Sequence, residues 1–413
     1  MKRVVVVGGG AAGFFAAIAC AEAGGLGAEV SAKAATVTIL EKTGHFLSKV
    51  KISGGGRCNV THACFDARAL ATHFPRGERP LIGPFQTFQP RDTIDWFKRR
   101  GVLMYTQDDG CLFPVSDSSQ TIIDCFIEAA EAAGVKLRVN AGVESITHDA
   151  TGFSLTLHGG ETLQADRVML ATGGCRVPAM GALAVSLGHT LEPPVPSLFT
   201  FHVDAPWVHE LAGIVIEPVE AAAAGLRETG ILLFTHWGVS GPVILRLSAW
   251  GARKLADLNY SFTLQLHWLP GRTTEAIGEQ LDALRDLHPA KLVVNTPLAP
   301  LTARLWESLV LAAGVPRDTR WSGLSKSQQH RLVQQLIRTE LPVTGKTMNK
   351  DEFVTCGGVR LSEVNFKTME SKLVPGLYFA GELLDIDGIT GGFNFQSCWT
   401  TGWLAGNAMA SET

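Results

Sequence analysis

A glycine turn near the amino terminus constrains the fold more than any other feature of the chain. A β-branched run at 4–7 leads into Gly8-x-Gly10-x-x-Gly13, and a helix-like stretch follows over 11–23. In such a turn the first glycine permits the tight bend, the second lets backbone approach a pyrophosphate, and the third lets helix and strand pack closely. The start of the helix offers amide donors to phosphate. The pattern predicts a dinucleotide-binding βαβ unit.

An acidic residue follows the second strand of this unit. The strand-like run 37–40 ends on Glu41, with Lys42 next to it. Glu41 is predicted to accept hydrogen bonds from a ribose diol, which disfavours a ribose that carries a 2′-phosphate. The spacing from Gly13 to Glu41 exceeds the usual ~20 residues. We attribute the excess to a lengthened loop in the Gly- and Ala-rich segment 24–35.

Composition narrows the class of protein further. The chain has 413 residues, 46% hydrophobic, with 36 Lys and Arg against 39 Asp and Glu, a net charge of −3. This indicates a folded protein without a global positive field, so neither nucleic acid nor an anionic membrane is expected as its main partner. No apolar stretch reaches the ~20 residues that span a bilayer. The basic start and apolar run resemble a signal peptide, but the glycine turn interrupts them.

The cysteines indicate a reducing compartment. Eight are scattered along the chain, without a C-x-x-C pair or a His spacing that suits zinc. We therefore expect a cytoplasmic protein with no metal site.

Alternating strand and helix patterns predict an α/β fold, with a Rossmann-type domain interrupted by an insertion. Prolines at 193, 194 and 196 mark a change to strand-like segments, and a capping box over 325–328 opens a helix that Pro342 is expected to end. The predicted division is 1–192 for the first part of the dinucleotide-binding domain, 193–270 for an inserted β-rich substrate subdomain, 271–346 for a small helical subdomain and 347–413 for the second part of the first domain.

A second glycine-rich motif spans 53–59. It reads Ser-Gly-Gly-Gly-Arg-Cys-Asn, and its backbone amides can form an anion nest while Arg57 holds a phosphate or a flavin carbonyl. The alternative is a flexible surface loop. Cys58 and Cys64 invite a redox interpretation, but their spacing favours two free thiols.

A third motif lies near the carboxyl terminus. Gly381-Glu382 begins it, and Gly391-Gly392 precedes a final helix whose amides are expected to stabilise negative charge on a reduced flavin ring. Asp385 and Asp387 are interpreted as a solvated loop face rather than as metal ligands.

These three motifs and the A-T-G-G run at 171–174 together resemble the YhiN-type FAD-dependent flavoproteins, which include BaiN-like and aminoacetone-oxidase-like oxidoreductases. The resemblance covers nearly the whole chain and implies FAD in a glutathione-reductase-like Rossmann domain with a β-barrel-like and a small helical insertion. Relatives usually read Gly-Arg before the Lys at position 49, where this chain has Leu47-Ser48. The implied FAD-binding residues are Gly8, Gly10, Ala12, Gly13, Glu41, Lys42, Gly56, Arg57, Cys58, Asn59, Val143, Thr172, Gly173, Gly381, Glu382, Gly391, Gly392, Phe393, Asn394, Phe395 and Gln396.

The expected function is an FAD-dependent oxidoreductase that acts on a small organic substrate by hydride transfer, as an NAD(P)H-linked reductase. A second G-x-G-x-x-G is missing, so NAD(P)H is expected to bind only transiently. Alternatives are an oxidase of small amines, a flavin-binding redox protein without turnover that uses Cys58 or Cys175 as its reporter, and an RNA-modifying flavoenzyme, which the net charge disfavours. The sequence predicts no particular oligomeric state.

His236 is the candidate proton donor or acceptor. It lies between Phe234 and Trp237 and before a Gly-Pro turn in the β-rich insertion. Histidine suits proton transfer near neutral pH, although a histidine in this setting also serves as a structural hydrogen-bonding residue.

Overall fold

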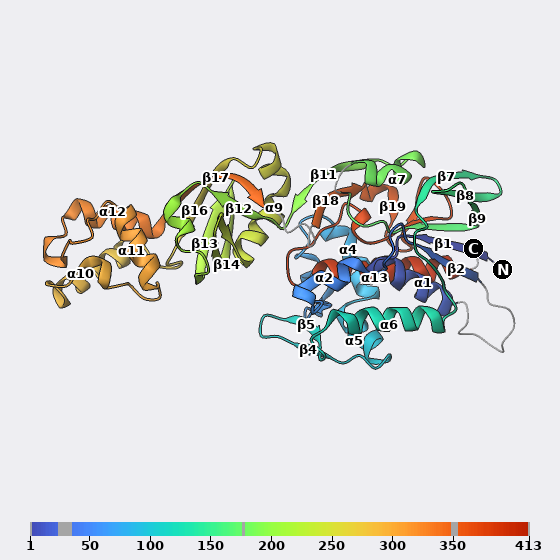
Figure 1. Ribbon diagram of the computed structural model, residues 1–413, viewed down its shortest axis with the longest axis horizontal. Helices are drawn as coiled ribbons and strands as arrows, with labels where there is room; N and C mark the ends of the chain where they lie inside the picture. The colour runs from blue at the N-terminus through green and yellow to red at the C-terminus, as the bar shows by residue number, and fades with distance from the viewer. Residues whose placement is uncertain (1, 24–34, 176–177, 348–353, 412–413) are drawn as a thin grey trace. The chain divides into compact units, whose positions relative to one another are not determined.

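The computed structural model describes residues 2–23, 35–175, 178–347 and 354–411, and most of the predicted loop 24–35 lies outside them. The chain divides into two compact units (Figure 1). The first combines residues 1–197 with 350–413, and the second comprises 198–349. Each unit is described by itself.

The first unit is built on a mainly parallel sheet. Its described strands run in the order β19-β20-β21-β10-β1-β2-β6, and those from β21 to β6 are parallel. Their bounds are β1 Lys2–Val7, β2 Ala35–Leu40, β6 Lys136–Arg138, β10 Arg167–Leu170, β19 Val364–Asn365, β20 Glu370–Ser371 and β21 Leu377–Phe379. Strand β1 lies between β2 and β10, and its valines from 4 to 7 are buried. The β-branched run therefore forms a buried strand inside the parallel part of the sheet.

Helices pack against this sheet, and α1 (Ala11–Ala23) lies beside α13 (Phe393–Ala410) (Figure 1). Their close approach depends on glycine, because a Cβ on Gly402 would lie 2.7 Å from the Ala12 carbonyl oxygen. The remaining helices of this unit are α2 Ser48–Gly56, α3 Ala67–Ala71, α4 Glu78–Thr87, α5 Pro90–Lys98, α6 Ser119–Ala132 and α7 Ala182–Ser186, with the 3-10 turns η1 Pro178–Gly181, η4 Leu361–Glu363 and η5 Gly381–Leu383. The two ends of the chain thus form one Rossmann-type core.

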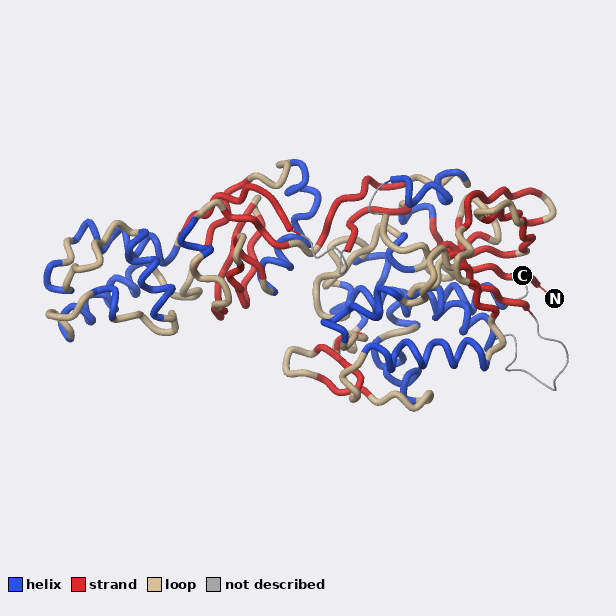
Figure 2. Tube along the Cα trace, viewed as in Figure 1, coloured by secondary structure: helices blue, strands red, loops and turns tan. Residues whose placement is uncertain are grey.

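Smaller antiparallel sheets complete the first unit (Figure 2). Their strands are β3 Thr61–His62, β4 Met104–Thr106 and β5 Cys111–Pro114; β7 Val143–Asp149, β8 Gly152–Leu157 and β9 Thr162–Ala165; and the pair β11 Leu191–Ser197 with β18 Val354–Val359. Because β11 pairs with β18, the first unit extends to Ser197, beyond the predicted boundary at residue 193.

The second unit contains a closed barrel in the order β12-β15-β14-β13-β16-β17. Its strands are β12 Thr200–Val203, β13 Val215–Ala223, β14 Leu226–Thr235, β15 Gly238–Ser240, β16 Phe262–His267 and β17 Thr339–Thr347, accompanied by α8 Pro206–His209 and α9 Pro242–Asp257. Three helices, α10 Thr274–Leu287, α11 Ala303–Ala312 and α12 Lys326–Ile337, with the turns η2 Val293–Asn295 and η3 Trp321–Gly323, fill the stretch between β16 and β17.

The predicted capping box at the start of α12 is confirmed. However, α12 ends at Ile337, and Pro342 lies inside β17 rather than at the helix end. The last strand of the barrel therefore lies mostly in the region 271–346, which was predicted to be helical. One hydrophobic core runs through the barrel and the three helices, so the two predicted insertions form a single compact unit.

Candidate active site

The amino-terminal glycine turn has the geometry that its spacing predicts. The Gly8 amide donates to the Leu40 carbonyl at 2.8 Å, and the Phe14 amide donates to the Gly10 carbonyl at 3.0 Å. A Cβ on Gly13 would overlap the Gly8 carbonyl oxygen, so only glycine lets α1 pack this closely on the turn. The first turn of α1 contains no acidic side chain. Its amide donors are therefore available to an anion.

The space beside Gly10 shows whether the turn has room for a cofactor. A Cβ built on Gly10 meets no atom within 4 Å, whereas a Cβ on Gly8 would overlap the Ala171 carbonyl oxygen. The open space beside Gly10 is the position from which backbone approaches a pyrophosphate in this type of turn. The turn therefore fits the diphosphate of FAD.

Glu41 lies directly beside the glycine turn, after β2. Its carboxylate accepts the Gly9 amide at 3.0 Å through Oε2, and the Thr43 amide and hydroxyl at 2.8 Å each through Oε1. The Ala141 amide donates to the Glu41 carbonyl at 2.8 Å, which places the segment leading to Val143 next to it. Lys42 is exposed. The structure thus holds the predicted ribose acid in a fixed orientation at the edge of the turn.

The A-T-G-G run follows β10 and borders the same turn. The Ala171 amide donates to the Val7 carbonyl at 2.8 Å, and Thr172 is exposed. Gly173 has a left-handed φ of 79°, and a Cβ there would meet nothing within 4 Å. A Cβ on Gly174 would lie 2.5 Å from Oε1 of Glu382. This run therefore connects the amino-terminal turn to the carboxyl-terminal motif.

The second glycine motif ends α2. Gly54, Gly55 and Gly56 all have left-handed φ values, and a Cβ on Gly55 or Gly56 would meet nothing within 4 Å. Arg57 follows, with its guanidinium 4.2 Å from the centre of the Phe113 ring and 3.7 Å from Asp117. Arg57 thus already has an aromatic and an acidic neighbour, and a cofactor contact would add to them.

Asn59 joins the second motif to the third. In the orientation that gives both the amide nitrogen and the amide oxygen of Asn59 a partner, the nitrogen donates to the Thr61 carbonyl at 3.0 Å and the oxygen accepts a hydrogen bond from the Gly392 amide at 3.2 Å. A Cβ on Gly392 would lie 2.5 Å from the same Thr61 carbonyl. The side chain of Asn59 therefore fixes the glycine pair that precedes α13.

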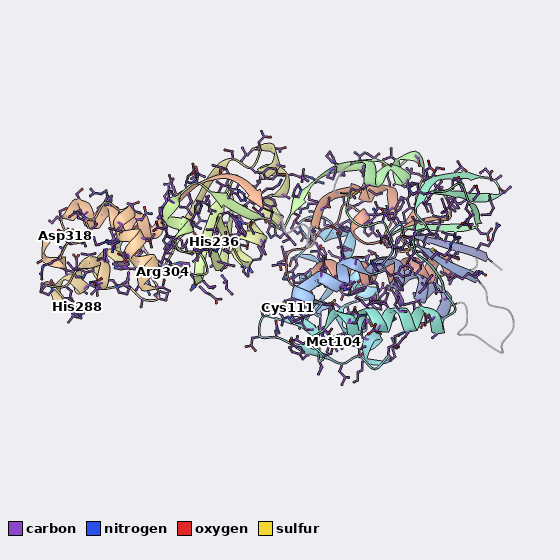
Figure 3. All side chains as sticks on the ribbon, in the orientation of Figure 1. Met104, Cys111, His236, His288, Arg304 and Asp318 are labelled. Atoms are coloured by element: carbon purple, nitrogen blue, oxygen red, sulfur yellow. The ribbon has the colours of Figure 1, made fainter. Side chains whose placement is uncertain are left out.

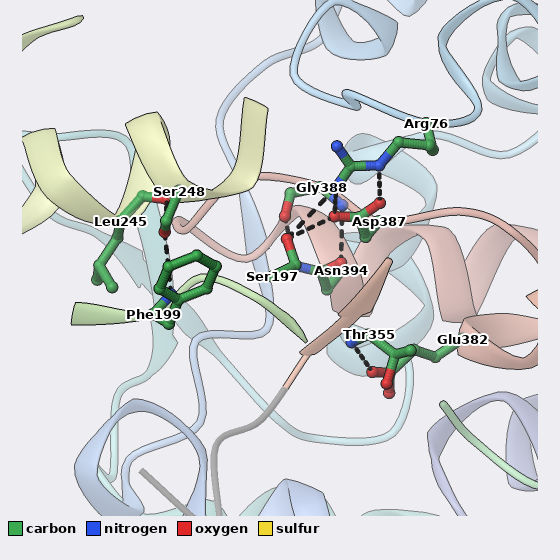
Figure 4. A network of polar contacts seen from close by, with 10 residues as sticks. All are labelled: Arg76, Ser197, Phe199, Leu245, Ser248, Thr355, Glu382, Asp387, Gly388 and Asn394. Carbon is green, nitrogen blue, oxygen red and sulfur yellow. Dashed lines mark hydrogen bonds and ion pairs between the residues drawn. The ribbon is translucent and has the colours of Figure 1, made fainter. Parts of the chain in front are cut away.

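The third motif is held in place by its own side chains. Asn394 accepts the Gly388 amide at 2.8 Å and donates to the Gly388 carbonyl at 2.9 Å (Figure 4). A Cβ on Gly381 would lie 2.9 Å from the Cβ of Ala12, which brings the third motif against α1. Four segments far apart in the sequence thus converge on one region of the first unit.

Three of the predicted cofactor residues lie on α13 and make contacts with other side chains of the protein. Gln396 is fully buried, and its Oε1 accepts the hydroxyls of Thr61 and Thr93 at 2.6 and 2.9 Å. Phe393 is buried and stacks on His73 with ring centres 4.3 Å apart, and Phe395 stacks on Trp399 at 5.4 Å. These side chains shape the wall around the glycine pair.

Glu382 has a basic partner that the sequence analysis did not select. Its Oε2 accepts from Lys49 Nζ at 2.5 Å, and its Oε1 accepts the Thr355 amide at 2.9 Å (Figure 4). Lys49 belongs to α2. The ion pair links α2 to η5, and only a long-range contact reveals it.

Asp387 corrects the interpretation of the acidic loop. Instead of facing solvent, Asp387 is fully buried, and its Oδ1 accepts Nε of Arg76 at 2.5 Å (Figure 4). Its Oδ2 forms an ion pair with the Arg76 guanidinium and accepts the Ser197 hydroxyl at 2.6 Å. Burial raises the pKa of this carboxyl despite the arginine. The group anchors the loop that leads to the glycine pair.

Cys58 is buried with a left-handed φ of 63°. Burial raises its pKa to about 12, so the thiolate needed for disulfide exchange is scarce at neutral pH. Cys64 is also a free thiol, and burial raises its pKa. This environment agrees with the interpretation of both as free thiols.

His236 lies in the second unit, in the turn between β14 and β15 (Figure 3). Its side chain is exposed, and the neighbouring Trp237 is 44% exposed. The imidazole is therefore available to solvent rather than buried in a structural hydrogen bond. Its role in proton transfer stays a prediction.

The fold and the converging glycine turns define a class, the Rossmann-type flavoproteins. The chain belongs to the HI0933-like protein Rossmann domain family, whose model matches residues 2–408. It is an FAD-dependent oxidoreductase, which confirms the expected class, fold and cofactor. Among the described helices, none is both long and apolar enough to cross a membrane.

Three similar proteins are informative. A ribosomal RNA dihydrouridine synthase of Escherichia coli strain K12 is 31% identical over 97% of this chain and 96% of its own. A 3-dehydro-bile acid delta(4,6)-reductase of Clostridium scindens is 30% identical over the full length of both. The crystal structure of 3-ketosteroid-delta4-(5alpha)-dehydrogenase from Rhodococcus jostii RHA1 has a TM-score of 0.52 at 16% identity, covering 100% of this chain and 97% of its own, and shows the shared fold.

Proposed function

We propose that this protein is an NAD(P)H-linked reductase of carbon–carbon double bonds conjugated to a carbonyl group. The observation that carries the proposal is a feature common to two relatives with different substrates. A dihydrouridine synthase saturates a pyrimidine double bond next to a carbonyl, and a delta(4,6)-reductase of 3-dehydro bile acids saturates double bonds conjugated to a ketone. We assign the shared reaction type to this chain, but neither of the two individual substrates.

The converging glycine turns supply what this reaction requires of the protein. FAD, when bound, supplies two-electron hydride chemistry. The Gly10 turn and Glu41 are the residues that would hold its adenosine diphosphate half, and Gly391 and Gly392 would face the ring half. The first turn of α13 contains no acidic side chain, so its amides favour negative charge beside it. This arrangement supports reduction rather than a purely structural use of the cofactor.

A redox protein without turnover is the less favoured alternative. Such a protein would need a reactive thiol as reporter, and the two candidates are Cys58 and Cys175. Burial raises their pKa values to about 12 and about 11 respectively. Neither thiol is suited to exchange at neutral pH.

We place the reaction in the cytoplasm, where NAD(P)H is available as a transiently bound electron donor.

An anaerobic reduction screen tests the proposal. The purified flavoprotein is mixed with NADH, NADPH or small amines while flavin absorbance is followed, and the reduced protein is then mixed with a conjugated enone or with oxygen. A nicotinamide should reduce the flavin, and the enone should reoxidise it faster than air-saturated buffer does. Reduction by an amine followed by fast reoxidation with peroxide formation would establish an oxidase and overturn the proposal.

A further inference from the structure

Two histidines of the first unit pack against the first residue of α13, beside the glycine pair. The ring of Phe393 stacks on the imidazole of His73 with centres 4.3 Å apart and on that of His62 at 4.7 Å. The two imidazoles are 6.1 Å apart. A Cβ on Gly391 would lie 3.5 Å from Cδ2 of His62. His62, which the sequence analysis did not select, is therefore within van der Waals range of the glycine pair.

The hydrogen bond of His62 determines which ring nitrogen carries the hydrogen in the neutral imidazole. Nε2 lies 3.0 Å from the carbonyl oxygen of Asp109, and a carbonyl oxygen can only accept. Nε2 is therefore the donor, and Nδ1 has a free lone pair. Nδ1 is buried and has no hydrogen-bond partner among the described residues. A buried polar atom without a partner is uncommon and calls for a physical explanation.

Several features favour the neutral form of His62. Burial lowers its pKa, the hydrogen bond to the Asp109 carbonyl opposes this shift, and a positive charge on His73 would add to it. A hydrogen on Nδ1 would be a buried donor without a partner. The start of α13 carries partial positive charge, and residues 393–396 contain no acidic side chain to offset it. A protonated ring therefore needs a negative charge nearby.

The other titratable groups around His62 do not supply that charge. Cys111 is its cross-strand partner in the β4–β5 hairpin, and Cys64 lies two residues further along the chain. Burial raises the pKa of both thiols, that of Cys111 to about 11, so neither is ionised near pH 7. The carboxylate of Asp109 is exposed and accepts the Cys111 amide at 3.0 Å. His73, from the segment after α3, can add only positive charge.

We propose that His62 takes up a proton when the bound flavin is reduced. The proposal rests on the position proposed above for the ring half of FAD, beside Gly391 and Gly392. A hydride carries two electrons and one proton, so its transfer from NAD(P)H to the neutral ring leaves one negative charge there. That charge stabilises a nearby imidazolium. One proton from solvent then binds Nδ1 of His62, and the net charge of the site is the same before and after reduction.

This coupling suits the proposed reaction. Saturation of a conjugated double bond consumes one hydride and one proton. With His62 protonated, the reduced protein holds both. The free and buried Nδ1 is then explained as the atom that receives the proton.

Histidine NMR on the parent protein tests the proposal directly. The Cε1 carbons are labelled with ¹³C, and the signals are titrated in the apoprotein, the oxidised flavoprotein and the chemically reduced flavoprotein. His62→Gln, or His62→Asn if the first variant fails to fold, identifies the signal of His62. An opposite charge nearby moves a pKa by about 1–3, so the pKa of His62 should rise by at least about 1 on reduction. The same pKa in the oxidised and reduced proteins would overturn the proposal.

The midpoint potential of the bound flavin is the second readout. For each proton that a two-electron couple takes up, a tenfold change in proton concentration corresponds to about 30 mV. Between the pKa values of His62 in the two redox states, the potential of the parent should therefore change by about 30 mV per pH unit more than that of His62→Gln. Flavin content and melting temperature are measured for each protein to confirm folding.

His148→Gln is the matched control. The ring of His148 also packs on a phenylalanine, Phe153, with centres 4.5 Å apart, but it belongs to the β7–β8 hairpin. Its replacement should leave the slope of potential against pH as in the parent. Equal slopes for the parent and His62→Gln, or an equal decrease in the control, would contradict proton uptake by His62.

Enone reduction by NAD(P)H, measured on the same preparations, separates this inference from the proposed function. Enone reduction by a parent protein whose His62 has one pKa in both redox states would overturn the proton uptake and leave the reductase function standing. A redox-dependent pKa of His62 in a protein that reduces no enone would support the proton uptake and overturn the function alone.

Discussion

Arg76 and Asp387 form a buried two-point ion pair between segments far apart in the chain. Nε of Arg76 donates to Oδ1 of Asp387 at 2.5 Å, and its terminal nitrogen pairs with Oδ2. The side chains are 11% and 0% exposed, and the Ser197 hydroxyl also donates to Oδ2. This pair fixes the loop that carries Gly388, whose amide and carbonyl bond to Asn394. The position of the glycine pair before α13 thus depends on an ion pair whose arginine lies outside the motif.

Breaking this ion pair should destabilise the first unit strongly. Arg76→Met leaves a buried carboxylate without its partner, which costs about 3–5 kcal/mol of unfolding free energy. Arg79→Met removes an exposed arginine from the first turn of α4, which begins just after Arg76, and should cost under about 0.5 kcal/mol. Urea unfolding measures both. Equal stabilities for the two variants would contradict a structural role for the pair.

Glu41 is expected to contribute to FAD affinity. Glu41→Ala removes a carboxylate that can accept hydrogen bonds from the ribose, at a cost of roughly 1.5–3 kcal/mol. Thr43→Ala removes a hydroxyl that orients the carboxylate but leaves the acid, and should have a smaller effect. Isothermal titration of the apoprotein with FAD provides the affinities. A change below about 0.5 kcal/mol for Glu41→Ala would show that this residue is not the ribose acid.

Local sequence signals predicted the elements that depend on local chemistry. The β-branched run and the glycine turn gave the bounds of α1, and the capping box located the start of α12. The helix α9 was missed inside the predicted β-rich insertion, although Pro242 at its first turn after Gly241 is a usual helix start. The strand β17 was also missed, because the barrel pairing that stabilises it joins residues far apart in sequence.

The candidate site was predictable in its glycines but not in its supporting contacts. The glycines that adopt a left-handed φ, or that leave no room for a Cβ, are grouped in short motifs, and such motifs can be recognised in the sequence. The bond from Asn59 to Gly392 and the pairs Lys49 with Glu382 and Arg76 with Asp387 join distant segments, so no spacing rule indicates them. The burial of Asp387 likewise follows only from tertiary packing.

Cys58 should resist alkylation in the folded protein. Burial disfavours the thiolate and raises the pKa to about 12, so at pH 8 only about one molecule in ten thousand is ionised. Reactivity should increase as pH rises toward that value while the fold persists. Peptide mapping after iodoacetamide treatment measures the extent of modification, with urea-unfolded protein as the control. Alkylation of native Cys58 at the unfolded rate would contradict its inert assignment.

His236→Gln should lower turnover on an identified substrate and leave the fold intact. The side chain is exposed in a turn of the barrel, so its replacement disturbs no packed core. Histidine can donate or accept a proton near neutral pH, and glutamine cannot. Steady-state kinetics, flavin content and melting temperature are compared with those of the exposed control His330→Gln. Unchanged turnover would remove His236 from the mechanism.

The flavin content of Gly10→Val tests the central claim, that FAD is held at the amino-terminal turn. The space beside Gly10 is open within the protein, so the apoprotein should fold with a melting temperature near that of parent apoprotein. Two added methyl groups would occupy the position of the pyrophosphate. Absorbance of the purified protein should therefore show less than about a tenth of the parent's flavin per chain, and added FAD should not restore it. A folded variant that retains the parent's flavin content would contradict the account.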